Sequence, residues 1–321
     1  MKKKFIITID TEGDDLWTNK ITRNGLKEIT TENAKNLERF QLLCEKYGFV
    51  PVYLTNYEMA LAQPFIEMAR CALKNKRAEV GMHMHAWNSP PIEPLPYNPR
   101  GTHTYIGEYP RQLQWEKMKY LTRLLEDTFQ TPITSHRSGR WWFDEFTLKC
   151  LRKLGYVVDC SMTPYISWAD SIGNRQYGVD YSKDHYQGEY MLSAKNIHKR
   201  GRSGVYEVPP TILKHYTYRF PKVQQSVEWF RPNGRNLKEM LWIKNKIKRS
   251  ERYGYLQFML HSSELTVGTS PTFKNKRSIE KLYSDLGILF EEVSKQFEGI
   301  GITDYIKEKH MVRQGGKSKE K

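Results

Sequence analysis

The sequence contains few cysteines and no long apolar run. Its 321 residues include four cysteines, and no two of them have C-x-x-C spacing (Cys44, Cys71, Cys150 and Cys160). This excludes a small disulfide scaffold and indicates buried free thiols. No segment approaches the roughly 18 consecutive apolar residues of a membrane-spanning helix. No internal repeat is present.

The N-terminal segment resembles a signal peptide only briefly. After Met1 and three lysines, the apolar run is interrupted by Thr8 and ends at Asp10. A signal peptide needs roughly 7–15 apolar residues and a small-residue cleavage site. We therefore expect a cytoplasmic protein.

The composition is typical of a folded, basic protein. Hydrophobic residues make up 39% of the chain and charged residues 27%, which is enough to fill a large core. The 51 Lys and Arg against 36 Asp and Glu give a net charge of +15. Such a charge favours polyanions or anionic surfaces as neighbours, including peripheral association with a membrane surface. No nucleic-acid-reading module is recognisable, so no nucleic-acid partner is expected.

Short β-rich runs alternate with amphipathic helical segments along the chain. We predict strands at Lys4–Ile9, Val50–Leu54, Glu79–Met84, Ile133–His136, Tyr156–Cys160, Val205–Val208, Tyr255–Leu260 and Ile300–Thr303. We predict helices at Asn33–Tyr47, Pro64–Lys74, Leu113–Phe129, Asp144–Gly155, Leu237–Lys248 and Ile279–Phe297. This alternation indicates an α/β fold of parallel βαβ units, in an open sheet or a closed barrel.

The composition shows no break that would separate two large domains. We predict one domain over residues 1–305, followed by a basic flexible tail over residues 306–321. The stretches Trp87–Pro110 and Thr163–Gly204 do not fit the alternation. Loops of this length inside a compact domain are usually functional or disordered, and these two are rich in aromatic residues. We interpret them as insertion loops of a binding groove.

Reactive side chains follow the predicted strands at their carboxyl ends. They come after four different strands: Asp10, Glu12, His83, His85, Arg137 and His261. In a parallel barrel these strand ends meet at one rim, where active sites are built. The sequence therefore predicts one site that contains all of them.

The acidic and the histidine pairs have the spacing of a metal site. Residues two apart on an extended chain face the same side, so Asp10 and Glu12 can share a pocket, as can His83 and His85. Imidazole suits zinc and similar metals, and two histidines plus a carboxylate leave a position for water. Asp14 is an alternative to Glu12 as the carboxylate. The competing interpretation is a solvated acidic turn with one core and one surface histidine.

Three further features add to the predicted site. Arg137 can pair with Asp10, or form a structural salt bridge elsewhere. The adjacent Trp141 and Trp142 are either a wall for sugar stacking or core residues. His261 is suited to act as a general acid near neutral pH, or is an ordinary histidine at a strand end.

These segments, in this order, resemble the five motifs of the polysaccharide deacetylase family with the NodB-homology domain, a carbohydrate esterase type, in a WalW-like branch. The matching segments are Ile7–Glu12, Glu79–His83, Arg137–Gly139, Leu151–Tyr156 with Asp159–Ser161, and Leu260–Ser262. The family usually has two adjacent Asp residues in the first motif, where Thr11 separates Asp10 from Glu12 here. Its two histidines are usually four apart, whereas the residue four beyond His83 is Trp87.

The resemblance implies a deformed (β/α) barrel of about seven parallel strands. It also implies a hydrolase of non-peptide carbon–nitrogen bonds that removes acetyl from an N-acetylated sugar, in a glycan or in a lipid- or nucleotide-linked precursor. One divalent metal, expected to be zinc, would be held by Glu12, His83 and His85. Asp10 would be the base, oriented by Arg137, and His261 the acid.

Four residues are predicted substrate contacts, from the loops, the Arg137 turn and a later strand: Trp87, Trp141, Trp142 and Glu207. Two other functions remain open. One is a hydrolase of another non-peptide C–N bond on the same scaffold. The other is a non-catalytic barrel that binds glycans or polyanions.

Overall fold

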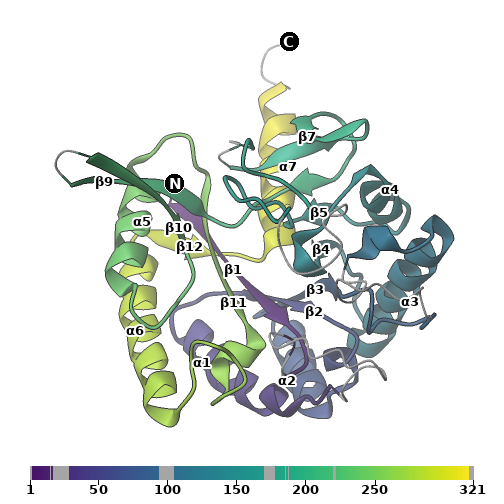
Figure 1. The fold of residues 1–321 in the computed structure, drawn as a ribbon, viewed down its shortest axis with the longest axis horizontal. Coiled ribbons are helices and arrows are strands. Elements are labelled where there is room, and N and C mark those ends of the chain that lie inside the picture. Colours follow the sequence, from purple (N-terminus) through teal and green to yellow (C-terminus); the bar gives the residue numbers. More distant parts are fainter. Residues whose placement is uncertain are drawn as a thin grey trace.

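A curled and mostly parallel β-sheet forms the centre of the fold, and helices cover its outer side (Figure 1). The computed structural model describes residues 2–14, 16, 29–93, 105–169, 178–184, 186, 188–219 and 222–317. Within these residues, seven strands pair in parallel in the order β11 (Tyr255–His261), β1 (Lys3–Thr11), β2 (Pro51–Thr55), β3 (Glu79–Met84), β4 (Ser135–Ser138), β5 (Val158–Asp159) and β8 (Tyr206–Glu207). The predicted deformed barrel of about seven parallel strands is confirmed.

The first strand shows why these apolar runs form a sheet with two buried faces. Phe5, Ile7 and Ile9 belong to the large core between the sheet and the helices. Ile6 belongs to a second core, inside the curl of the sheet. Side chains alternate along a strand, so Thr8 and Asp10 lie on the same side as Ile6. The strand therefore carries polar side chains into the interior at its carboxyl end.

Six helices pack on the sheet close to the predicted positions. They are α1 (Leu37–Lys46), α2 (Gln63–Lys74), α3 (Arg111–Phe129), α4 (Glu145–Lys153), α5 (Leu237–Arg249) and α6 (Lys276–Ser294). The backbone N–H of Thr147 donates to the Asp144 carboxylate at 2.7 Å, so Asp144 caps α4 as expected. None of the helices in the described part of the chain is long and apolar enough to span a bilayer.

The last helix closes the amino end of the barrel. Ile302, Tyr305 and Ile306 of α7 (Ile302–Lys317) belong to the inner core together with Ile6 and Val52. The carboxyl end of the strands is therefore the end left for a site. The domain boundary predicted at residue 305 falls within α7. The flexible tail remains a prediction, and residues 318–321 lie outside the described residues.

The strand predicted at Ile300–Thr303 is wrong. The strand here is β12 (Phe297–Gly299), which pairs with the start of β1, and α7 begins at Ile302. The Glu79 carboxylate accepts hydrogen bonds from the backbone N–H and the hydroxyl of Thr303, at 3.0 and 2.6 Å. This side chain satisfies a donor of the first helical turn, a contact that local sequence does not reveal.

Four strands were not predicted. β6 (Tyr190–Ser193) and β7 (Asn196–Arg200) extend the sheet antiparallel beyond β8, within the stretch predicted as an insertion loop. β9 (Ile212–Arg219) and β10 (Lys222–Trp229) form an antiparallel hairpin that projects from the barrel (Figure 1). Both strands of the hairpin are rich in polar and aromatic residues, so they lack the apolar signal of the core strands.

Candidate active site

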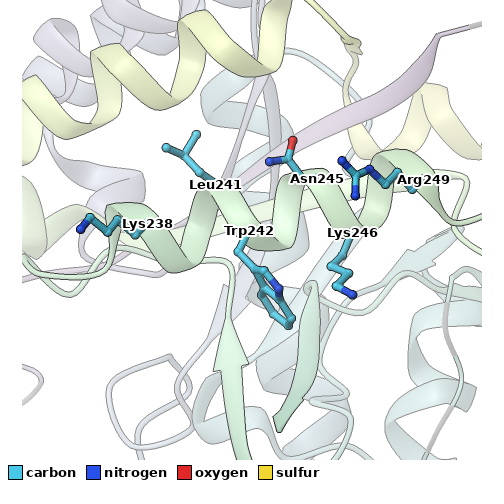
Figure 2. Close-up of a pocket in the computed structure, with 6 residues that line it drawn as sticks. All are labelled: Lys238, Leu241, Trp242, Asn245, Lys246 and Arg249. Atoms are coloured by element: carbon cyan, nitrogen blue, oxygen red, sulfur yellow. The ribbon is translucent and has the colours of Figure 1, made fainter. Parts of the chain in front are cut away.

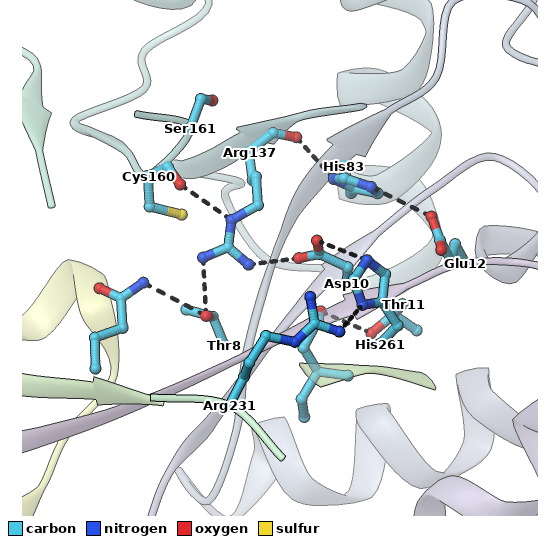
Figure 3. A network of polar contacts seen from close by, with 12 residues as sticks. Thr8, Asp10, Thr11, Glu12, His83, Arg137, Cys160, Ser161, Arg231 and His261 are labelled. Atoms are coloured by element: carbon cyan, nitrogen blue, oxygen red, sulfur yellow. Dashed lines mark hydrogen bonds and ion pairs between the residues drawn. The ribbon is translucent and has the colours of Figure 1, made fainter. Parts of the chain in front are cut away.

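The carboxyl ends of four parallel strands bring the predicted reactive side chains together, and Figure 3 shows all of them except His85. In the register of the sheet, Asp10 of β1 lies beside His261 of β11, and His83 of β3 lies beside Arg137 of β4. Glu12 follows β1 directly, and His85 follows β3 directly. The predicted convergence at one rim is what the structure shows.

Glu12, His83 and His85 form a buried group with the geometry of a metal site. Their ligand atoms all lie within 4.8 Å of one another. The carboxylate oxygen Oε2 of Glu12 is 2.8 Å from Nε2 of His85 and 3.4 Å from Nε2 of His83. Two imidazoles and one carboxylate are donors that suit zinc and similar divalent ions. The residues present therefore fit a divalent cation.

The orientation of His83 is set by the backbone of β4. Its Nδ1 lies 3.0 Å from the carbonyl oxygen of Arg137. Because a carbonyl only accepts, Nδ1 carries a hydrogen, and this bond fixes the ring with Nε2 toward Glu12. Histidine ligands of metals are commonly held in this way by a carbonyl on the second nitrogen.

Glu12, and not Asp14, is the carboxylate of this group. The Asn33 side chain donates to the Glu12 carbonyl at 2.9 Å, and Ser262 bonds to the Glu12 backbone at 3.0 and 3.1 Å. The Asp14 carboxylate instead accepts from the hydroxyl of Thr30, the backbone of Glu32 and the side chain of Asn33. The Asp14 carboxylate thus binds residues 30–33, and it is not part of the group of ligand atoms formed by Glu12 and the two histidines.

His85 lies between a glycine turn and a tryptophan. A Cβ atom on Gly139 would lie 2.5 Å from Nδ1 of His85 and 2.6 Å from the carbonyl oxygen of Met84. Only glycine therefore permits this close approach of the turn after β4 to the imidazole. The Trp87 ring lies 4.3 Å from the His85 ring, centroid to centroid.

Asp10 is held by a fully buried arginine. Arg137 Nη1 lies 2.5 Å from Oδ1 of Asp10, and His261 Nε2 lies 3.6 Å from Oδ2. Arg137 also donates to the Thr8 hydroxyl at 2.9 Å and to the Cys160 carbonyl at 3.0 Å. The predicted Arg137–Asp10 pair is present, and the interior face of β1 supplies two of the arginine's acceptors.

The surroundings keep both carboxylates ionised. Burial alone would raise the pKa of Asp10, but the nearby charges of Arg137, His83 and His261 lower the pKa below its ordinary value. Burial would likewise raise the pKa of Glu12, yet its hydrogen bonds with His83 and His85 lower it. An ionised carboxylate is the form that accepts a proton or binds a cation.

The two imidazoles shift in opposite directions. Burial lowers the pKa of His85 below its ordinary value. Burial also acts to lower the pKa of His83, but Asp10 and Glu12 outweigh it, so the pKa is raised. The anionic environment that stabilises a protonated His83 equally stabilises a bound cation.

Two charged residues beside His261 were missed by the sequence analysis. Glu264 Oε2 accepts the backbone N–H of His261 at 2.8 Å and lies 3.4 Å from its Nδ1. Arg231 Nη2 lies 3.0 Å from both oxygens of Glu264 and 3.4 Å from His261 Nδ1. An acid three residues after the start of a helical turn is a capping signal, which could have identified Glu264. No local signal marks Arg231, because it comes from the end of the unpredicted hairpin.

A tryptophan cluster lies beside the arginine. The Trp141 ring is 5.1 Å from the Arg137 guanidinium, and it stacks on Trp168 at 6.2 Å and 11°. Trp229, at the base of the hairpin, completes the cluster at 5.5 Å from Trp141. Three indole rings and a cation thus form one wall near Asp10.

Trp142 and Glu207, the other predicted substrate contacts, are buried away from this wall. Trp142 packs on Gly107, where a Cβ atom would meet its ring at 2.1 Å. Glu207 is fully buried and accepts the backbone N–H of Met162 at 3.0 Å. Burial raises the pKa of Glu207 strongly, and the Asp159 carboxylate raises it further. The predicted substrate contact of these two residues stays a prediction.

Comparison with known proteins identifies the fold. No family model and no curated protein matches the chain. A candidate polysaccharide deacetylase from Mycobacterium smegmatis is similar in structure, with a TM-score of 0.53 and 12% identity over 97% of this chain and 92% of that one. A 4-α-glucanotransferase from Thermococcus litoralis has a TM-score of 0.52 and 10% identity, over 96% of this chain and 40% of that one.

The resemblance to polysaccharide deacetylases is therefore confirmed for the fold, and the WalW-like branch remains a prediction. The glucanotransferase shows that the same fold also occurs in enzymes named for a different reaction. Because fold does not determine function, the reaction must be argued from the residues of the site.

Proposed function

We propose that this protein is a metal-dependent hydrolase that removes an acetyl group from the nitrogen of an N-acetylated sugar. The observation that carries the proposal is the buried Glu12–His83–His85 group next to the Arg137–Asp10 pair. A protein that only binds glycans needs neither a cation site nor a carboxylate held ionised by a buried arginine. The site has the parts that amide hydrolysis requires: a cation site, a base and an acid.

A divalent cation, which we expect to be zinc, would be held by Glu12, His83 and His85. When bound, such an ion polarises a carbonyl and lowers the pKa of water. Two histidines and a carboxylate leave room in a tetrahedral shell for water or substrate.

The remaining residues handle protons. Asp10 accepts the proton of the attacking water, and Arg137 keeps its carboxylate ionised and oriented for this task. His261 lies on the other side of Asp10 and donates a proton to the departing amine. Its side chain is 12% exposed, so it can exchange protons with solvent at the rim.

The substrate class follows from the wall of the site and the charge of the chain. Trp87 and Trp141 lie next to His85 and Arg137, where aromatic faces can stack on a sugar ring. The net charge of +15 suits a phosphate-bearing substrate. We therefore propose a lipid- or nucleotide-linked glycan precursor, used in glycan biosynthesis in the cytoplasm, as the acceptor.

Acetate release tests the proposed function. The purified protein is loaded with Zn²⁺ and incubated with a panel of N-acetylated sugars, free and carried on a diphosphate. We expect acetate from at least one of them, and loss of release after chelation. Opening of a cyclic imide to its half-amide, without acetate release from any sugar, would instead indicate another C–N hydrolase. Metal-independent glycan binding without any turnover would indicate a binding protein.

His261→Ala is expected to slow turnover by roughly a hundredfold to ten-thousandfold while the metal content stays unchanged. The reason is that the amine leaves poorly without a proton. Turnover and bound metal are measured on the same preparation. The surface variant His198→Ala, whose side chain is 44% exposed, is the matched control.

The basicity of the leaving amine provides a second test of His261 as the acid. An acetanilide with a weakly basic amine needs little protonation, so His261→Ala should slow its hydrolysis much less than that of an acetylated sugar. Equal losses on both substrates, or unchanged turnover, would remove His261 from the role of acid.

A further inference from the structure

The hairpin of β9 and β10 and the neighbouring helix α5 carry a large share of the positive charge of the chain. Their 29 residues contain eight Lys or Arg against two acids, Glu228 and Glu239. They thus contribute a net +6 of the +15 of the whole chain. We call these two elements the hairpin–α5 surface.

Contacts between rings hold the two elements together. The His215 ring of β9 lies 4.5 Å from the Trp242 ring of α5, and Lys246 Nζ lies 5.8 Å from the same indole. Figure 2 shows Trp242 and Lys246 projecting from the same side of α5. They line a shallow groove of 360 Å³ with four other residues of the helix: Lys238, Leu241, Asn245 and Arg249. The groove is therefore lined by three basic side chains together with Leu241 and Trp242.

The other face of the hairpin is apolar and exposed. Residues directly opposite in an antiparallel pair share a face, and Tyr218 lies opposite Val223 while Tyr216 lies opposite Gln225. Tyr216, Tyr218 and Val223 are 57%, 68% and 63% exposed. His215 alternates with these tyrosines, so the tyrosine face points away from α5. A two-stranded hairpin with such a face exposed usually has a binding partner to cover it.

Most of the basic side chains of the two elements are available for binding, and they belong to α5 or to the side of the hairpin that faces it. Lys222, Lys238, Lys246, Lys248 and Arg249 are all exposed. Lys244 is the exception, since it is buried and lies 3.4 Å from the carboxylate of Glu292.

We infer that the hairpin–α5 surface docks on an anionic phospholipid membrane, with the projecting hairpin immersed in the headgroup layer, its tyrosines on one side and the basic side chains on the other. This inference goes beyond the proposed reaction and does not depend on it. Tyrosine rings settle at the boundary between headgroups and acyl chains, while Lys and Arg are attracted to anionic lipids. A hairpin with exposed tyrosines next to a basic helix therefore has the side chains that bind at the boundary of an anionic membrane.

A second copy of the chain fits this surface less well. A symmetric dimer would place the same patch on itself, and so bring two net charges of +6 together. Like charges facing each other across an interface are costly, whereas an anionic lipid surface neutralises them.

Vesicle sedimentation with the full chain tests the inference. One set of vesicles is phosphatidylcholine, and the other an equal mixture of phosphatidylcholine and phosphatidylglycerol. We expect the protein to sediment with the mixed vesicles at low salt and to be released as salt is raised. Equal binding to both sets, or to neither, would overturn the inference. The inference would also be overturned if duplex DNA released the protein from the vesicles and the variants described below bound DNA as tightly as the wild type.

Charge reversal identifies the surface. Lys246→Glu, Lys248→Glu and Arg249→Glu together should weaken binding to the mixed vesicles on the order of a hundredfold or more. The control has the same net charge and reverses three exposed residues of α2 and α4: Lys74→Glu, Lys149→Glu and Arg152→Glu. Equal loss in both variants would mean that overall charge drives binding, and would overturn the assignment to this surface.

Removal of the apolar face gives an independent readout. Tyr216→Ser, Tyr218→Ser and Val223→Ser together should weaken binding by about tenfold, because less apolar area enters the membrane. The control replaces three exposed apolar residues elsewhere: Leu42→Ser, Leu61→Ser and Ile288→Ser. Circular dichroism verifies that each variant is folded. Unchanged binding of the hairpin variant would exclude the tyrosine face, and acetate release from soluble sugars should be unaffected in either case.

Discussion

His83→Ala should yield a folded protein that retains almost no metal and releases no acetate above background. The substitution removes an imidazole whose Nε2 faces Glu12 and whose Nδ1 is fixed by the Arg137 carbonyl. A carboxylate and a single histidine hold a divalent ion weakly, so both the ion and the reaction are lost. We expect the rate to fall by at least about a thousandfold. Elemental analysis and acetate release are measured on the same preparation.

The control separates a lost ligand from general damage. His198→Ala removes a half-exposed histidine whose ring pairs with Asp184 and lies 6.0 Å from the Tyr181 ring, and should change neither metal content nor rate. His85→Ala should repeat the loss of metal. Full activity of metal-free His83→Ala protein would refute the proposed metal-dependent reaction. Full metal content without activity would mean that other residues hold the ion.

Arg137→Met is expected to have the largest effect on stability. The side chain is fully buried, and its loss leaves the Asp10 carboxylate without its main partner. Breaking a buried ion pair from one side costs about 3–5 kcal/mol. Urea unfolding of the wild type and the variant at neutral pH measures the difference in the free energy of unfolding.

A double variant tests whether the unpaired charge is the cause. Asp10→Asn with Arg137→Met removes both charges, and should recover most of the stability but none of the activity. If the double variant is no more stable than Arg137→Met, the loss comes from the hydrogen bonds of Arg137 to Thr8 and Cys160 instead.

The pH dependence of the same variant has a definite sign. In the wild type the lowered pKa of Asp10 stabilises the fold above the unfolded pKa of about 4, and this contribution is lost as the pH falls through the folded value. In Arg137→Met the effect of burial dominates, so the pKa of Asp10 rises. Protonation of this carboxylate at low pH then removes the unpaired buried charge. The stability difference between the two proteins should therefore be largest at neutral pH and shrink as the pH is lowered.

The core strands and the reactive residues were predictable because each has a local signal. An apolar run such as Phe5–Ile9 marks a buried strand, and a charged residue directly after it marks the rim. The spacing of His83 and His85 was enough to predict a shared pocket, since alternation along a strand is a local property.

The missed features depend on contacts between distant segments. Arg231 reaches His261 only because a polar hairpin returns the chain to the rim, and its strands have no apolar pattern. The start of α7 depends on Glu79, which lies 224 residues before Thr303. Trp142 and Glu207 were predicted as substrate contacts from the tryptophan pair after Arg137 and from the end of a later strand. Both are buried, which the local sequence did not reveal, and their contact with substrate stays a prediction.

The position of α7 has a consequence for how the protein is made. The first turn of this helix fills the amino end of the barrel, against residues such as Ile6 and Val52 from the earliest part of the chain. During synthesis, the inner core cannot close before residues 302–306 have left the ribosome, some 250 residues after β2. The strands of the nascent barrel therefore keep their inner apolar side chains uncovered for most of the time in which the domain is made.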